Sequence, residues 1–281
     1  MRLAFRIVAR LVLAGALIGG AFLGFAWREA HRPPVIRRAT IALPDWPAGA
    51  APISVALGSD VHVGGGAMDP ARLNRMVDRI AALRPDLAIF AGDFIDGHDP
   101  ATARRNGPVL TAAMRRLRPP LGIVAVLGNH DHDSDPAAVA RALRAARATV
   151  LENDAITRGP LAIGGVGDAF SRHDRLPQAL LALKQQVGAR LIVSHSPDLA
   201  PALLPRDGSL LLAGHTHCGQ VVLPLVGAPW IPSRYGSRYR CGIIREGARS
   251  TIVTAGLGTS LLPLRLNAPP DIWLIRLQGA R

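Results

Sequence analysis

Two histidines separated by one residue, His215 and His217, directly follow an apolar run that ends at Gly214. The run, residues 210–213, has the composition of a buried strand and should deliver both side chains to the rim of a sheet, where open α/β folds place their ligands. Imidazoles gathered at such a rim suit a metal ion. A short His-x-His spacing is weak evidence by itself, because two loop histidines without any role would look the same.

Polar residues also follow four other apolar runs, over residues 53–58, 87–91, 123–127 and 190–193. They are Asp60 and His62, Asp93 and Asp96, Asn129 to Asp131, and His195. Each has an ordinary structural explanation when taken alone: a turn former, a helix cap or a satisfied core histidine. Because strand ends that are distant in sequence meet at one edge of a sheet, we expect all of these groups to converge on one site.

The donor set that would converge there contains carboxylates, imidazoles and an amide oxygen, with no thiolate. Such a set favours Mn, Fe or Zn over copper or an iron–sulfur cluster. It is large enough for two divalent metal ions. With one shared carboxylate as a bridge, the ions would clamp both oxygens of an in-line phosphoryl displacement and lower the pKa of a bridging water.

The elements that would position this site indicate an α/β fold. Strands over 53–58, 87–91 and 123–127 alternate with helices, one starting at Asp69-Pro70, one over 108–117 and one starting at Asp135-Pro136. This order predicts a mostly parallel sheet covered on both faces. The second half predicts a helix over 177–187 and antiparallel strands that complete a second sheet. These strands cover residues 161–166, 190–193, 210–213, 221–223, 242–245, 251–254 and 272–277.

The N-terminus predicts a membrane segment. An uncharged run over 11–27 lies between arginines on both sides, so residues 1–30 read as an anchor or as a signal peptide with a poor cleavage site near 24–26. Since both flanks are basic, the side of the membrane stays open. Residues 31–52 read as a proline-rich linker with an edge strand over 39–43, and residues 53–281 as the domain that carries the site.

Composition narrows the partners. The 281-residue chain has a formal net charge of +13, but aromatic residues make up only 4% of it, so it lacks the stacking platform of a single-strand nucleic-acid binder. We expect no nucleic-acid partner, whereas anionic lipid head groups fit the charge. Its two cysteines, Cys218 and Cys241, exclude a disulfide-stapled fold. Two unpaired thiols are the favoured interpretation; a disulfide would tie the His-x-His loop to a following strand and indicate an oxidising compartment.

Five dispersed motifs, in order over about residues 53–277, resemble those of the calcineurin-like metallophosphoesterase superfamily. They are Asp60-Val-His62, Gly92-Asp93-Phe-Ile-Asp96, Gly128-Asn129-His130-Asp131, Ser194-His195-Ser196 and Gly214-His215-Thr-His217. The resemblance implies a four-layer αββα sandwich with a dimetal site at the strand ends. It assigns Asp60, His62 and His217 to one metal, Asn129, His195 and His215 to the other, and Asp93 to both. It also implies that His130 steadies the phosphate and protonates the leaving oxygen, with Asp96 orienting it.

Departures from the superfamily pattern bear on the substrate. Protein phosphatases of this superfamily carry an arginine directly after the second aspartate, where this chain has Gly97, so a phosphoprotein substrate is not expected. The closer resemblance is to a membrane-associated bacterial phosphodiesterase branch, through the basic and apolar N-terminus and residues 215–220, 232–236 and 256–260. Cys218 stands where that branch has glycine. Three arginines are candidate substrate-binding cations: Arg234, Arg238 and Arg265.

The resemblance therefore implies a metal-dependent hydrolase of a phosphodiester or pyrophosphate, acting on a small or lipid-linked molecule. The location it implies is the bacterial inner membrane, or outside the cell if the N-terminal segment is cleaved. One alternative is the UDP-2,3-diacylglucosamine pyrophosphatase of lipid A assembly, which requires a site facing the cytoplasm. Two others are a non-catalytic binding protein on the same fold and a nuclease suggested by the basic charge. The oligomeric state is not predicted.

Overall fold

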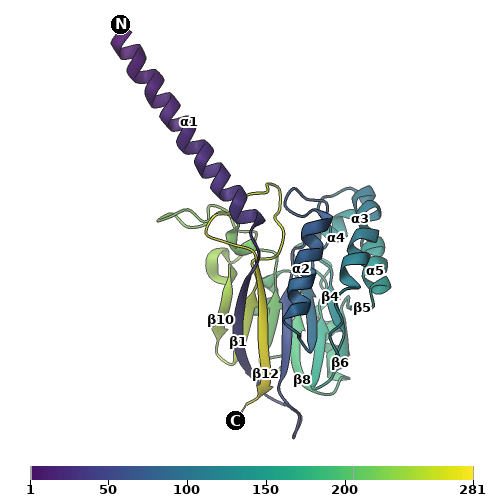
Figure 1. The fold of residues 1–281 in the computed structure, drawn as a ribbon. Helices are drawn as coiled ribbons and strands as arrows, with labels where there is room; N and C mark the ends of the chain where they lie inside the picture. Colours follow the sequence, from purple (N-terminus) through teal and green to yellow (C-terminus); the bar gives the residue numbers. More distant parts are fainter. Residues whose placement is uncertain (1, 205, 281) are drawn as a thin grey trace.

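The computed structural model describes residues 2–204 and 206–280, which form two six-stranded sheets packed face to face (Figure 1). Within the first sheet, the strands from β2 to β5 run parallel, β12 is antiparallel to β2, and β1 lies at the edge, parallel to β12. Its strand order is β1 (Val35–Leu43), β12 (Asp271–Gly279), β2 (Ile53–Gly58), β3 (Leu87–Ala91), β4 (Ile123–Val126) and β5 (Ala148–Val150).

The second sheet is mixed. Its four central strands, β11, β9, β8 and β7, run parallel, and only the outer pairs are antiparallel. Its strand order is β10 (Gly242–Glu246), β11 (Arg249–Val253), β9 (Leu210–Ala213), β8 (Ala189–Val193), β7 (Leu161–Gly165) and β6 (Asp154–Arg158). The expectation of a second sheet is confirmed, but the expectation of antiparallel strands is wrong for its centre.

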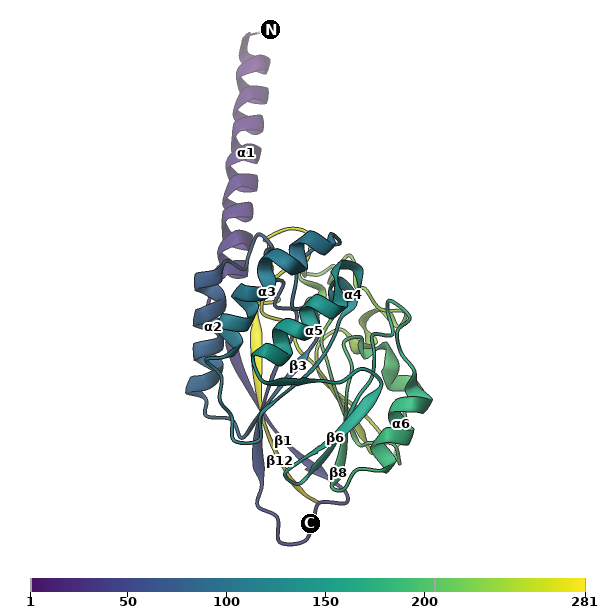
Figure 2. The same ribbon diagram turned by 90° about the vertical axis from the view of Figure 1, so that its right-hand side faces the viewer.

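Helices cover the outer faces of both sheets and complete four layers, as expected (Figure 2). On the first sheet lie α2 (Pro70–Ala82), α3 (Pro100–Met114), α4 (Asn129–Ser134) and α5 (Pro136–Ala145); on the second lies α6 (Leu176–Lys184). One apolar cluster fills the space between the two sheets. A second lies between the first sheet and its helices, and a third between the second sheet and its helix. The sandwich thus holds the strand ends, and whatever follows them, in fixed positions.

Three helices begin with the same Asp-Pro pair, in which the carboxylate caps a free backbone N–H and proline occupies the first turn. Asp69 accepts a hydrogen bond from the Arg72 amide at 2.7 Å, and Asp135 accepts one from the Ala138 amide at 2.9 Å. The third pair, Asp99-Pro100, starts α3. The expected helix start at residue 108 is therefore wrong. Pro108 lies inside α3, which begins eight residues earlier, at Pro100.

Two predicted strands also differ. Residues 272–277 are a strand, β12, but it inserts between β1 and β2 of the first sheet instead of completing the second. Residues 221–223 make only isolated bridges, to Leu266 and Gly227. The edge strand expected over 39–43 is confirmed at the edge of the first sheet and begins four residues earlier, at Val35.

The N-terminal helix, α1 (Arg2–His31), projects from the sandwich (Figure 1). Its apolar side chains are exposed over most of its length. Residues 4–31 have an 18-residue window with a mean hydropathy of 2.0, which is apolar enough to cross a membrane and is equally compatible with a signal sequence. Its last turns pack on the domain: Ala26 and Ala30 are buried, and the Ala26 carbonyl accepts a hydrogen bond from the Arg265 amide at 2.9 Å.

Candidate metal centre

The strand-end residues singled out from the sequence converge at one end of the sandwich. Asp60 and His62 follow β2, Asp93 follows β3, Asn129 begins α4 directly after β4, His195 follows β8, and His215 and His217 follow β9. All seven side chains are buried. The two sheets contribute facing ligands, because the carboxyl ends of their parallel strands meet at this end.

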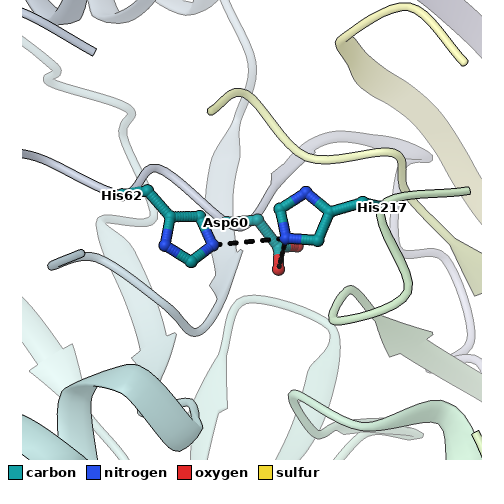
Figure 3. A group of neighbouring side chains, drawn as sticks. All are labelled: Asp60, His62 and His217. Atoms are coloured by element: carbon teal, nitrogen blue, oxygen red, sulfur yellow. Dashed lines mark hydrogen bonds and ion pairs between the residues drawn. The ribbon is translucent and has the colours of Figure 1, made fainter. Parts of the chain in front are cut away.

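Asp60, His62 and His217 form a first cluster (Figure 3). The Nε2 atoms of His62 and His217 lie 3.2 Å apart, and His217 Nε2 lies 3.4 Å from the Asp60 carboxylate. Two imidazole nitrogens and a carboxylate oxygen pointing at one another are the donors that a divalent metal ion prefers.

Asp93, His195 and His215 form a second cluster beside the first. The Asp93 Oδ2 atom lies 3.1 Å from His195 Nε2, and His215 Nδ1 lies 3.2 Å from the same nitrogen. Asp93 Oδ2 is also 3.6 Å from His62 Nε2, in the first cluster. One carboxylate oxygen therefore faces both clusters, which is the geometry of a bridging ligand.

Asn129 provides a separate test of whether these residues fit a metal centre. Its side-chain oxygen is buried, and within residues 2–204 and 206–280 no group donates a hydrogen bond to it. A buried amide oxygen without a partner costs free energy and calls for a ligand. Together with the two clusters it completes a donor set for two ions, so the residues fit a dimetal centre.

Comparison with known proteins agrees with this geometry. The model of the calcineurin-like phosphoesterase family matches residues 53–219, more than half of the chain and all seven candidate ligands. The chain belongs to the calcineurin-like phosphoesterase family. It is thus a phosphoester hydrolase by family, with a centre for two divalent metal ions, and the expected superfamily is confirmed.

Relatives in this family align over much of the chain. The metallophosphoesterase YkuE of Bacillus subtilis (strain 168) is 32% identical over 273 residues, covering 95% of this chain and 93% of the relative. The phosphodiesterase YaeI of Escherichia coli (strain K12) is 30% identical over 201 residues, covering 69% of this chain and 71% of the relative. A solved structure of a dimetal phosphatase from Danio rerio superposes with a TM-score of 0.48 at 13% identity, covering 74% of this chain and 88% of that one.

In this calcineurin-like centre, Asp93 and His195 each shift the pKa of the other. Burial opposes ionisation of Asp93, but the imidazoles of His195 and His62 outweigh it and hold the pKa of Asp93 well below its usual range. Burial also opposes protonation of His195, yet the Asp93 and Asp60 carboxylates raise its pKa well above its usual value. Asp93 is thus an anion at neutral pH, the form that binds a metal ion.

The backbone carries the ligands in an unusual conformation. Five of the candidate ligands have positive φ angles: Asp60 (49°), His62 (50°), Asp93 (55°), His215 (69°) and His217 (49°). Residues other than glycine rarely adopt this left-handed region, and each costs about 1–3 kcal/mol when held there. Gly92 belongs to the same arrangement, since its φ is 84° and a Cβ there would lie 2.7 Å from His195 Nδ1. Such concentrated strain is typical of functional sites.

Asp96 lies against a different histidine than expected. Its Oδ1 atom is 3.3 Å from the Nδ1 atom of His62, an ion-pair contact, whereas no ion pair or hydrogen bond joins Asp96 to His130 among the described residues. A carboxylate at the far nitrogen of a metal-binding histidine fixes the ring and directs its other nitrogen toward the metal. His195 is held by a hydrogen bond instead, since its Nδ1 lies 2.7 Å from the Ala91 carbonyl. The pairing of Asp96 with His130 is therefore not what the structure shows.

From this contact we expect Asp96→Asn to weaken metal binding about 10- to 100-fold, the usual effect of removing the partner of a ligating histidine. Titration of the metal-free protein with Mn²⁺ measures it. If Asp96 orients His130 instead, the variant will bind Mn²⁺ normally and lose turnover alone.

Asp131 is a supporting residue to which sequence reasoning gave no role. Its carboxylate accepts hydrogen bonds from the amides of Phe94, Ile95 and Gly128, at 2.9, 3.1 and 3.0 Å. It therefore ties the loop after β3, which carries Asp93, to the start of α4, which carries Asn129. Burial raises the pKa of Asp131 to about 7. The one sequence feature that could have indicated this role is its position as the last residue of the Gly-Asn-His-Asp motif.

Cys218 and Cys241 form a disulfide bond, so the favoured interpretation of two unpaired thiols is wrong. Two hydrogen bonds support the same connection: the Arg240 guanidinium donates to the Cys218 carbonyl at 2.9 Å, and the Thr216 hydroxyl donates to the Arg240 carbonyl at 2.7 Å. The separation of 23 residues does not indicate that the two cysteines pair. The pairing depends on the position of Cys241, which directly precedes β10, the strand that pairs with β11. The bond fixes the loop that carries His215 and His217.

The three candidate substrate-binding arginines occupy different positions. Arg265 is fully buried and donates to the backbone carbonyls of Ala255, Gly258 and Ala268, so the expectation that it contacts substrate is wrong. Its guanidinium also lies 3.3 Å from His217 Nδ1. Burial lowers the pKa of Arg265 to about 10, which leaves it charged at neutral pH. Arg234 and Arg238 are exposed, and Arg238 pairs with Glu246.

Because Arg265 holds several carbonyls at once, we expect Arg265→Lys to lower the free energy of unfolding by about 3 kcal/mol, as when a buried charge loses its partners. Denaturant unfolding of the two proteins measures the difference. Arg238→Lys is the matched control, because an exposed ion pair is worth only about 0–1 kcal/mol. A substrate-binding role for Arg265 would instead raise KM at unchanged stability.

Proposed function

We propose that this chain is a membrane-anchored hydrolase of a phosphodiester or pyrophosphate that uses Mn²⁺, Fe or Zn²⁺ at both positions of its dimetal centre. The observation that carries the proposal is the position of Asp93, 3.1 Å from His195 in one cluster and 3.6 Å from His62 in the other. We assign Asp60, His62 and His217 to one ion, and Asn129, His195 and His215 to the other. The catalytic domain then comprises residues 53–281, and the preceding segment, residues 31–52, adds the edge strand β1 to its first sheet.

Two metal ions, when bound, supply electrostatic stabilisation of the phosphoryl oxygens and lower the pKa of a water. The chain contributes ligand positions fixed in advance, which favours the transition state without reorganisation at the moment of reaction. Asp93 sets the spacing of the two clusters. Its other oxygen accepts a hydrogen bond from the His130 amide at 2.9 Å and so fixes the start of α4.

His130 is the candidate general acid. Its ring packs edge-on against His62, with centroids 4.7 Å apart, and therefore lies beside the first cluster. Neither ring nitrogen of His130 is taken up by a hydrogen bond within the described part of the chain, so one is available to donate a proton to the leaving oxygen. A positioned histidine in this role typically contributes about 10²–10⁴ in rate.

The end of α1 supports a retained anchor over a cleaved signal peptide. Cleavage near residues 24–26 would cut beside Ala26, whose carbonyl accepts the Arg265 hydrogen bond. Farther along, the Arg72 guanidinium donates to the Arg32 carbonyl at 3.3 Å. The last turns of α1 are thus part of the domain's packing, and the helix projects from the sandwich (Figure 1) beside Arg265, whose guanidinium lies 3.3 Å from His217 Nδ1.

The remaining alternatives have less support. The lipid A pyrophosphatase would act in the reducing cytoplasm, where a disulfide such as Cys218–Cys241 does not persist. A non-catalytic binding protein would not need a complete donor set held at a cost in backbone strain. A nuclease remains less favoured for the composition already described.

Purified full-length protein in detergent, loaded with Mn²⁺, tests the proposal directly. We expect hydrolysis of bis(p-nitrophenyl) phosphate and faster hydrolysis of a lipid-like phosphodiester or nucleotide sugar. Protease accessibility of the domain in sealed vesicles reports its side of the membrane. Hydrolysis of phosphomonoesters alone, or no metal-dependent hydrolysis at all, would overturn the proposal.

A further inference from the structure

We infer that this phosphoesterase binds the hydrocarbon chain of its substrate in an apolar pocket directly beside the metal centre. The inference rests on the proposed function, whose reaction it takes as given. The pocket has a volume of about 250 Å³. Its lining includes Thr216 and His217, which belong to the loop that follows β9. Most of its wall is hydrocarbon, from Val221, Trp230, Pro232, Leu261, Leu262 and Leu264.

Two loops build the pocket, and hydrogen bonds hold them together. The Gln220 side chain donates to the Ser260 carbonyl at 2.9 Å and accepts from the Ser260 amide at 2.9 Å. The backbones of Gln220 and Leu266 are also hydrogen-bonded, at 2.9 Å. Since Gln220 lies three residues after His217, the loop that presents a metal ligand also forms a pocket wall. A chain in the pocket would therefore lie at a fixed position relative to the reacting phosphoryl group.

The size and chemistry of the pocket select a hydrocarbon chain. Its volume is below the roughly 300–1,000 Å³ of pockets that enclose a whole drug-sized ligand, so it suits one part of a substrate. Trp230, Leu261 and Leu262 are 66%, 86% and 61% exposed, which is unfavourable in water and is relieved when an apolar ligand covers them. The loop that carries Leu261 and Leu262 leads directly to Arg265, whose amide donates to the Ala26 carbonyl of α1, so a lipid-linked substrate would enter beside α1.

A series of p-nitrophenyl alkyl phosphodiesters, from methyl to octyl, tests the pocket with full-length protein in detergent and Mn²⁺. We expect kcat/KM to rise about fourfold per added methylene until the pocket is filled, as burial of hydrocarbon predicts. Leu262→Ser and Trp230→Ala should flatten this dependence. The comparison is the ratio of octyl to methyl rates within each variant, so a general loss of activity does not affect it.

Leu225→Ser is the matched control. Leu225 is fully exposed at the tip of a neighbouring loop and does not line the pocket, so this variant removes similar apolar surface and should keep the chain-length dependence of the wild type. Any partitioning of substrate into detergent is the same for all variants.

Each other outcome refutes the inference. A flat dependence in the wild type, with the methyl ester still hydrolysed, overturns the pocket but leaves the proposed function intact. No hydrolysis of any ester overturns the proposed function. Equal slowing of all chain lengths by Leu262→Ser, with weaker binding to lipid vesicles, would show that the loops contact the bilayer instead. A preference for nucleoside over alkyl esters would assign the pocket to a base.

Discussion

Asp93→Asn is expected to remove bound metal and hydrolysis together. Asp93 Oδ2 faces both clusters, at 3.1 Å from His195 and 3.6 Å from His62, and the other oxygen fixes the His130 amide. An amide in its place keeps the shape but carries no charge and offers one oxygen instead of two. Loss of several kcal/mol of charge stabilisation corresponds to at least about a thousandfold in kcat/KM.

Metal content by mass spectrometry and turnover of bis(p-nitrophenyl) phosphate, measured on the same preparation, decide this prediction. Asp78→Asn is the matched control, because Asp78 is an exposed carboxylate that pairs with Arg116 far from the centre. It should bind metal and turn over as the wild type does. If Asp93→Asn kept both ions, Asp93 would not be the bridge.

His130→Asn should have the second largest effect: full metal content, with turnover lowered about 10²- to 10⁴-fold through loss of the proton donor. Asparagine preserves the backbone amide that Asp93 accepts, so α4 should keep its place. A substrate with a leaving group that needs no proton, such as p-nitrophenolate, should be less affected than an alkyl ester. That difference separates proton donation from simple binding.

His98→Asn provides the comparison for this variant. The His98 ring lies 4.9 Å from that of His130 but is exposed and paired with Asp133, so its loss should change turnover little. One result would reassign His130. Its ring groups with His62 and Asp93 in ligand-type geometry, and loss of an ion in His130→Asn would make it a ligand.

The sequence was sufficient to predict which residues meet at the site, because each follows an apolar run and parallel strands end at a common edge. It could not predict the partner of Asp96. The choice between His62 and His130 depends on side-chain direction in loops with positive φ, for which local sequence has no signal. The prediction that Arg265 binds substrate was wrong for a related reason. An arginine near the site suggests anion binding, but its burial depends on tertiary contacts with the carbonyls of Ala255 and Gly258, for which the local sequence has no signal.

Strand pairing between distant segments marks the same limit in the fold. The apolar run that forms β12 is recognisable, but its insertion between β1 and β2 joins residues more than 200 positions apart. Its local pattern is equally compatible with either sheet. The Asp99-Pro100 start of α3 is different, since the cap signal that identified two other helices was present there too, and Pro108 was mistaken for a helix start.

The contact between α1 and the domain has a geometric consequence. The Ala26 carbonyl accepts a hydrogen bond from the Arg265 amide, and the Arg265 guanidinium lies 3.3 Å from His217 Nδ1, so a single residue, Arg265, links α1 to a candidate metal ligand. With α1 in a bilayer, the protein would search for substrate by diffusion in a plane, and the short connection would hold its active site at a constant height above the lipid surface. In that arrangement α1 would determine how far from the membrane a phosphoester group must lie in order to be hydrolysed.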